Sequence, residues 1–219
     1  MKLERFERYV KMIHDTVYHE PSTPAFHNQL IDSVNREIID PLDLPKDSVV
    51  LDMGCGSGYW LETMRDRGYT NIRGVTMDDT DIAQCVSKGL TVSKQDMTFT
   101  DFADEELDLL FCRHALEHSP FPMLTLYEFN RITKTGATVY VEVPAPNQDR
   151  KHEDNQNHYS ILGNKMWDSL FSRAGFRVEM FNEFKFELDD EIAPSIIVHQ
   201  TETFYVYRLT KIQSMFGTK

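Results

Sequence analysis

The sequence has few cysteines and no long apolar run. Three cysteines, Cys55, Cys85 and Cys112, occur in 219 residues, and no two of them form a Cys-x-x-Cys pair. An odd number of widely separated cysteines argues against a disulfide framework and favours reduced thiols in a cytoplasmic protein. No apolar stretch approaches the ~20 residues of a membrane-spanning helix, and residues 1–5 lack the apolar segment of a signal peptide. The sequence therefore predicts a cytoplasmic protein with no membrane partner.

The sequence also lacks an excess of basic residues. Its 23 Lys and Arg are outnumbered by 35 Asp and Glu, which gives a formal net charge of −12 at pH 7. Phosphate backbones bind to clustered lysine and arginine side chains. The acidic balance therefore disfavours a nucleic-acid partner and favours a small-molecule substrate.

Helix-like and strand-like patterns alternate along most of the chain. Apolar residues recur at helical spacing over residues 3–17 and 26–38. The segments predicted after these, in chain order, are strand 49–53, helix 59–67, strand 72–76, helix 80–87, strand 90–93, strand 107–112, helix 123–132 and strand 137–143. Alternation of this kind is typical of a parallel sheet with helices on both faces.

The last third of the chain departs from this alternation. A helix is predicted at 165–174, ended by Gly175, and strands are predicted at 176–181 and 202–210. The segment between these two strands is short and contains Pro194, so it is a poor candidate for a crossover helix. The last strand is therefore expected to run antiparallel to its predecessor.

A turn with three glycines follows the first predicted strand. The sequence Val49-Val50-Leu51-Asp52-Met53 leads into Gly54-Cys55-Gly56-Ser57-Gly58. Glycines let the backbone turn sharply and approach a ligand closely, because they carry no Cβ. A dinucleotide fold uses G-x-G-x-x-G, with a pyrophosphate on the helix N-terminus. The spacing here differs, and an acid two positions before the glycines suits a cation better than a phosphate, which argues against an NAD-dependent oxidoreductase.

This motif resembles D/E-x-G-x-G-x-G, the first motif of the class I S-adenosylmethionine-dependent methyltransferases. The resemblance covers roughly residues 46–147 and implies an α/β, Rossmann-like, doubly wound fold with N-terminal helices. Its seven-stranded sheet is mostly parallel and has an antiparallel last strand. The implied cofactor is S-adenosyl-L-methionine, with S-adenosyl-L-homocysteine as product. We expect a single methyltransferase domain over 1–219, with a helical lid at 1–44, a cofactor-binding core at 45–147, and a substrate loop with the C-terminal helix and strands at 148–219.

The resemblance also implies roles for residues at the ends of the strands, where ligands bind in this fold. The family often places a ribose-binding acid at the end of the second strand, where this chain has Thr76. Either Asp78, the preferred candidate, or Asp79 binds the ribose from a shifted position, or Thr76 and backbone groups share the role; the alternative for these acids is an N-cap cluster of the next helix. Asp96 is expected to accept from the adenine amino group, and Trp60 either walls the cofactor or belongs to the core. The residues expected to bind the cofactor are Asp52, Gly54, Cys55, Gly56, Gly58, Trp60, Thr76, Met77, Asp78, Gln95, Asp96, Met97 and Arg113.

The segment His114-Ala115-Leu116-Glu117-His118 allows several interpretations. It reads as H-x-x-E-H, but a zinc-peptidase helix is excluded because the segment directly follows a strand and Pro120 and Pro122 follow it. It is also similar to the E-x-x-E-H metal segment of small-RNA terminal 2′-O-methyltransferases, with His152, Glu153 and His158 available on a later loop. The preferred interpretation is that His114 or His118 lines the substrate cleft without a metal.

The expected activity is methyl transfer to an N or O nucleophile of a small molecule. Histidine titrates near neutrality and suits proton removal, so the catalytic candidates are His114, His118 and His158. Tyr18, His114, His158 and Tyr159 are the expected substrate contacts. The alternatives are a metal-dependent RNA ribose 2′-O-methyltransferase and a non-catalytic S-adenosylmethionine-binding protein.

Overall fold

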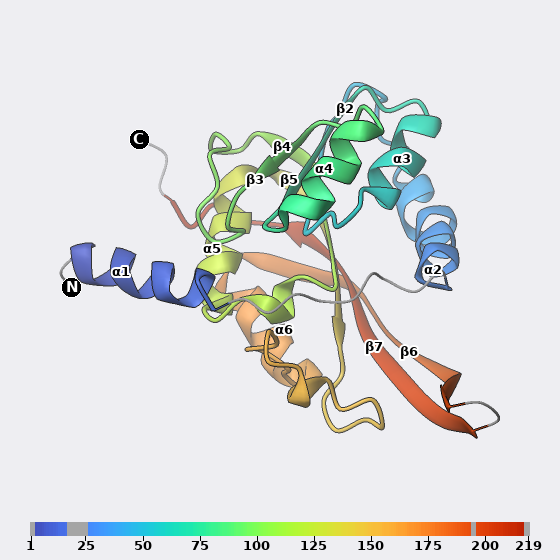
Figure 1. Ribbon diagram of the computed structural model, residues 1–219. Coiled ribbons are helices and arrows are strands. Elements are labelled where there is room, and N and C mark those ends of the chain that lie inside the picture. The colour runs from blue at the N-terminus through green and yellow to red at the C-terminus, as the bar shows by residue number, and fades with distance from the viewer. Residues whose placement is uncertain (1–2, 17–25, 194–195, 217–219) are drawn as a thin grey trace.

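A seven-stranded sheet forms the centre of the molecule (Figure 1). The computed structural model describes residues 3–16, 26–193 and 196–216. The strands lie in the order β3-β2-β1-β4-β5-β7-β6. Their bounds are β1 Val49–Met53, β2 Asn71–Thr76, β3 Val92–Lys94, β4 Leu107–Arg113, β5 Thr133–Pro144, β6 Phe176–Ala193 and β7 Ile196–Lys211.

The direction of the strands matches the expected fold class. Neighbours from β3 to β5 pair in parallel, whereas β7 is antiparallel to both β5 and β6. The predicted Rossmann-like sheet with a reversed last strand is thereby confirmed. The parallel strands bring their carboxyl ends to one edge, which is where this architecture binds ligands.

Helices cover both faces of the sheet. They are α1 Leu3–His14, α2 Phe26–Val34, α3 Tyr59–Asp66, α4 Asp79–Ser87, α5 Pro122–Ile132 and α6 Asn164–Arg173. Short helical turns follow α2 (η1 Asn35–Ile39 and η2 Asp40–Leu42), β4 (η3 Leu116–His118) and β5 (η4 His152–Asp154). Among the residues that the structure describes, no helix combines the length and the apolar content needed to cross a membrane.

Alternate residues of the central strands enter two separate apolar cores. In β4, Leu110 and Cys112 pack in the core beneath α5 and α6. Leu109 and Phe111 pack in the other core, beneath α3. Successive side chains of a strand point to opposite faces, so a strand buried on both sides is apolar at most of its positions. This explains the apolar run of residues 109–112 in β4.

The structure differs from the sequence expectations mainly in the length of the last two strands. The strands predicted at 176–181 and 202–210 extend to form the long hairpin of β6 and β7, which projects beyond the sheet at the lower right of Figure 1. Figure 1 also shows α1 and α2 on opposite sides of the molecule, with α1 at the left and α2 beside α3 at the right. Phe6 of α1 packs edge-on against Phe99, with ring centroids 5.7 Å apart. The lid role of residues 1–44 and the division of 1–219 stay predictions.

Candidate active site

The glycine turn at residues 54–58 connects β1 to α3, as the motif predicts. Its backbone has φ values of +85° at Gly54 and +49° at Gly56. A Cβ on Gly54 would lie 2.4 Å from the Cβ of Ala115, on the loop after β4, whereas a Cβ on Gly56 would meet nothing closer than 4.0 Å. Gly54 therefore allows two loops to pack together, and Gly56 leaves an open side on which a ligand can approach the backbone.

Asp52 places a buried acid beside this turn. It is 4 % exposed in β1. Burial raises the pKa of the Asp52 carboxyl to about 8, and the positive charge of Arg113 opposes this rise only in part. A cation bound next to Asp52 would favour its carboxylate form. An open glycine backbone beside a buried acid fits the zwitterionic, sulfonium-bearing methionine part of S-adenosylmethionine.

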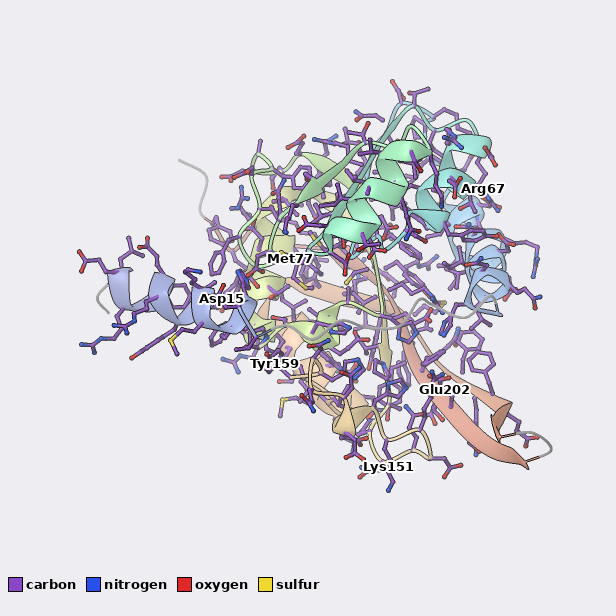
Figure 2. The ribbon with its side chains drawn as sticks, viewed as in Figure 1. Asp15, Arg67, Met77, Lys151, Tyr159 and Glu202 are labelled. Carbon is purple, nitrogen blue, oxygen red and sulfur yellow. The ribbon has the colours of Figure 1, made fainter. Side chains whose placement is uncertain are left out.

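The residues after β2 give Asp78 a structural role. Its Oδ1 accepts hydrogen bonds from the backbone N–H of Thr80 at 2.6 Å and of Asp81, so Asp78 is the N-cap of α4. Thr76 is buried, and its hydroxyl oxygen accepts a hydrogen bond from the backbone N–H of Asp78. Met77, labelled in Figure 2, is partly exposed. The N-cap alternative is thereby shown for Asp78, and its contact with a ribose stays a prediction.

The residues after β3 are engaged within the protein. Asp96 accepts a hydrogen bond from the backbone N–H of Thr98 on Oδ1, and its Oδ2 lies 2.7 Å from Nε2 of His14 on α1. Gln95 donates to the Ser93 hydroxyl and accepts from the Asp101 backbone. Met97 is half-buried against the core beneath α5 and α6. The predicted adenine acceptor Asp96 is therefore bonded to the N-terminal helix in this arrangement.

The side chains of Trp60 and Cys55 are both buried. The Trp60 ring is buried, stacks on Phe111 with centroids 4.1 Å apart, and donates its indole N–H to Asn35 at 2.8 Å. Cys55 is buried, and desolvation raises its pKa further above the ordinary value of a thiol. The alternative that Trp60 belongs to the core is thereby shown for its ring, which fills the space between α3 and the sheet, and its contact with the cofactor stays a prediction. The Cys55 thiol is therefore protonated at neutral pH, and its contact with the cofactor stays a prediction.

A buried ionic network surrounds Arg113 at the end of β4. Nε of Arg113 lies 2.9 Å from Oε1 of Glu142, and Nη2 lies 3.0 Å from Nδ1 of His27. The Tyr140 hydroxyl donates to the other Glu142 oxygen at 2.6 Å. Burial works against the charge on Glu142, but Arg113 and His114 outweigh it and bring its pKa to about 2. An ionised Glu142 thus neutralises Arg113, which leaves this arginine a weak candidate for a free anion-binding group.

The sequence reasoning missed three members of this network. Glu142 and Tyr140 lie in the apolar run of β5, and His27 comes from α2. A charged residue in the middle of a buried strand is a detectable signal, because an ion is rarely buried without a partner. Nothing in the local sequence pairs His27 with Arg113, which is 86 positions away.

The structure brings the three catalytic candidates into one neighbourhood. The loop after β5 folds against the turn after β4, where the backbone N–H groups of Tyr159 and Ser160 both donate to the Glu117 carbonyl, at 2.9 and 3.0 Å. Nδ1 of His114 lies 3.4 Å from Oε1 of Glu117. The rings of His118 and His158 have centroids 4.7 Å apart. Residues from two loops that are about 40 positions apart therefore form one cluster.

The remaining candidate residues differ in exposure and in their partners. Tyr159 is 46 % exposed on the loop after β5, where Figure 2 labels it. Tyr18 lies outside the described residues. His152 and Glu153 belong to η4, where His152 pairs with Glu202 and Glu153 accepts from the Asn147 backbone. Leu116–His118 form only the short turn η3, so the H-x-x-E-H pattern is not carried by a long helix.

Comparison with known proteins identifies the family. Residues 26–183 match the family described as "Methyltransferase domain". The chain belongs to the methyltransferase domain family. This is the class I S-adenosylmethionine-dependent methyltransferase family with a Rossmann-like fold, whose methyl donor is S-adenosylmethionine and whose product is S-adenosylhomocysteine. This membership decides against the dinucleotide oxidoreductase that the glycine spacing already disfavoured. The chain spans less than half the length of the curated relatives it matches.

The chain is similar to several methyltransferases, two of which are named for different acceptors. The chain is 31% identical over 99 residues to a ubiquinone biosynthesis O-methyltransferase of Pseudomonas aeruginosa, and the match covers 42% of each protein. A SAM-dependent methyltransferase from Archaeoglobus fulgidus has a TM-score of 0.65 at 20% identity, covering 84% of this chain and 94% of its own. A phosphoethanolamine N-methyltransferase of Haemonchus contortus, bound to S-adenosylhomocysteine, has a TM-score of 0.64 at 13% identity, covering 83% of this chain and 53% of its own. The two structural likenesses concern the fold.

Proposed function

We propose that this methyltransferase transfers the methyl group to an oxygen or nitrogen atom of a small molecule. The observation that carries the proposal is the cluster of His114, Glu117, His118 and His158. Three of its members lie within three residues of Ala115, the loop position that packs on Gly54. The relative from Pseudomonas aeruginosa is named for O-methylation, which supports an oxygen acceptor. The likeness to an N-methyltransferase concerns the fold alone and leaves a nitrogen acceptor open.

The pairing of the nearby arginines supports a small acceptor rather than a nucleic acid. Arg113 is paired with the buried Glu142, and Arg150 lies 2.8 Å from Oε2 of the buried Glu202. A phosphate backbone is bound by cationic side chains whose charge is available. Carboxylates of the protein neutralise the charge of both arginines, in agreement with the net charge of −12.

The histidines of the cluster differ in their protonation. Burial disfavours the charged form of His114, but its contacts with Glu117 and Glu142 outweigh burial and raise its pKa. Burial lowers the pKa of His158, so this imidazole is neutral near pH 7 and presents a lone pair. A neutral imidazole can accept a proton or ligate an ion, whereas a protonated one can do neither. His158 is therefore the member best suited to act on an acceptor.

The cofactor supplies a methyl group that is already activated on a sulfonium and leaves behind a neutral thioether. The protein then has to position the acceptor, exclude water and remove a proton where the acceptor carries one. We propose that Asp52 and the backbone at Gly54 and Gly56 hold the methionine part of the cofactor, and that Asp78 contacts the ribose. We also propose that Asp96 reaches the adenine after His14 moves away.

A labelled-methyl screen tests this proposal. The purified protein is incubated with S-adenosylmethionine that carries an isotopic methyl group. Three separate incubations add small hydroxyl compounds, small amines or RNA as the acceptor. Label in a small hydroxyl or amine product supports the proposal. Label in RNA alone would replace it with the RNA-modifying alternative. Tight binding of S-adenosylhomocysteine with no transfer to any acceptor would instead favour a non-catalytic binding protein.

A further inference from the structure

Glu117, His118 and His158 come together in a way that suits a metal ion. One ligand atom from each of these side chains can be chosen so that all three lie within 4.8 Å of one another. We propose that these three residues bind one divalent first-row transition-metal ion. The inference rests on the proposed function, because the ion would act on the acceptor of the same site, and it departs from the expectation of a metal-free cleft.

The carboxylate of Glu117 is incompletely satisfied without an ion. Glu117 is 1 % exposed, and its Oε1 lies 3.4 Å from Nδ1 of His114. Its Oε2 is buried and has no hydrogen-bond partner among the described residues. A buried carboxylate oxygen without a donor is costly, and buried charges are normally paired or coordinate a metal. A cation between Glu117 and the two histidines would remove this cost.

Hydrogen bonding fixes which nitrogen of His158 can bind the ion. Nδ1 lies 2.9 Å from the backbone carbonyl oxygen of His152, and a carbonyl can only accept, so Nδ1 carries the proton. Nε2 therefore holds the lone pair, and it lies 3.2 Å from the side-chain nitrogen of Asn155, which must give up this contact when the ion binds. Metal-binding histidines usually donate their other N–H to a carbonyl or a carboxylate in this way.

The two loops that supply the ligands are already held together. The backbone N–H groups of Tyr159 and Ser160 donate to the Glu117 carbonyl, and the Ser160 hydroxyl donates to the Ser119 carbonyl at 2.8 Å. Both ends of the ligand set are therefore fixed by hydrogen bonds that do not involve the ligand atoms. A preformed set of this kind loses little conformational freedom when it binds an ion.

Two histidines and one carboxylate are a donor set used by catalytic zinc and by other divalent transition metals. Three protein ligands leave at least one position for water or for an acceptor oxygen. An acceptor hydroxyl bound there would have a lowered pKa and lose its proton to solvent. Its oxygen would then attack the methyl carbon while the carbon–sulfur bond breaks and the sulfur keeps the electron pair. The site thus favours an oxygen acceptor over an amine.

Titration of the chelator-treated protein with Zn²⁺ alone, followed by calorimetry, tests the site. A parallel titration with Co²⁺ alone reads the visible absorption that nitrogen ligands give to this ion. The expected result is one ion per chain. Removing one ligand by Glu117→Gln, His118→Ala or His158→Ala should weaken binding by about 100-fold or more, above the ~10–100-fold typical of outer-shell partners. His14→Ala, which removes a histidine on α1 outside the cluster, is the control and should bind Zn²⁺ like the unaltered protein.

Binding of S-adenosylhomocysteine, measured on the same samples, shows that each variant is folded and separates the two proposals. The metal site is overturned if the unaltered protein binds no Zn²⁺ or Co²⁺, or if the three ligand variants bind Zn²⁺ as tightly as His14→Ala. In that case cofactor binding and methyl transfer without added metal would leave the proposed function standing. Conversely, stoichiometric Zn²⁺ binding without transfer to any small molecule would refute the proposed function and keep the site.

Discussion

Replacing Gly54 and Gly56 one at a time by alanine should separate packing from ligand binding within the same turn. Both glycines have positive φ, so each alanine costs about 1–2 kcal/mol of backbone strain. At Gly54 the new methyl group would also lie 2.4 Å from the Cβ of Ala115, and overpacking of this kind costs a further ~1–3 kcal/mol. At Gly56 the nearest atom is 4.0 Å away, so no packing cost is added.

Urea denaturation without ligand should therefore show Gly54→Ala destabilised by about 2–5 kcal/mol and Gly56→Ala by only about 1–2 kcal/mol. In calorimetry with S-adenosylhomocysteine, Gly56→Ala should lose more affinity than Gly54→Ala. The Gly56 methyl group would enter the open side of the turn, and an overlap costing about 1–3 kcal/mol weakens binding roughly 5- to 150-fold. Equal destabilisation by the two substitutions would refute the packing argument. Unchanged affinity in Gly56→Ala would refute the assignment of the open side to the cofactor.

Three further results are expected from the buried polar groups. In urea denaturation, Trp60→Phe should lower the free energy of unfolding by about 1–3 kcal/mol, because the Asn35 side chain is left without the indole donor. The affinity of this variant for S-adenosylhomocysteine should stay unchanged. Cofactor affinity measured by calorimetry should rise between pH 6 and pH 8, because Asp52, with a pKa of about 8, must lose its proton to pair with a cation, and Asp52→Asn should remove this dependence. Glu142→Gln should cost about 3–5 kcal/mol at pH 7, since it leaves Arg113 buried without its counter-ion. The pKa of Glu142 in the folded protein, about 2, lies below the ordinary 4.5. The stabilisation of the folded state by ionised Glu142 is therefore present above pH 4.5 and is lost as the pH falls towards 2. Urea denaturation curves at pH 7 and pH 3 check this.

The parts of the fold that the sequence predicted correctly are those with strong local signals. The buried strand of residues 107–112 is apolar at every position except Asp108, and the helix that follows the glycine turn has its apolar residues on one side. The end of α6 is set by Gly175, whose φ is +82°. Each of these signals acts over a few residues, because strand and helix periodicity and turn geometry are properties of neighbouring positions.

The length of the final hairpin could not be predicted from the sequence. Residues 182–193 and 196–201 continue β6 and β7 beyond the predicted strands, although they include a run of acidic residues that is unfavourable for a strand. Their extended form follows from pairing of the two strands with each other over sixteen registered positions, from Phe176 with Lys211 to Ala193 with Ile196. Pairing partners come from tertiary contacts, so intrinsic propensity alone underestimates such a hairpin.

Within the site, the sequence by itself determined the residue types and the glycine turn, and the tertiary structure decided which of them meet. The spacing of Gly54, Gly56 and Gly58 after Asp52 was sufficient to indicate the cofactor class. It could not show that Trp60 points into the core, that Asp78 caps α4, or that His14 reaches Asp96 across 82 positions. Nor could it place His158 against His118, because this contact depends on a loop that is held by hydrogen bonds to the Glu117 carbonyl. Local chemistry is encoded by adjacent residues, whereas the meeting of distant side chains depends on how the whole sheet and its loops pack.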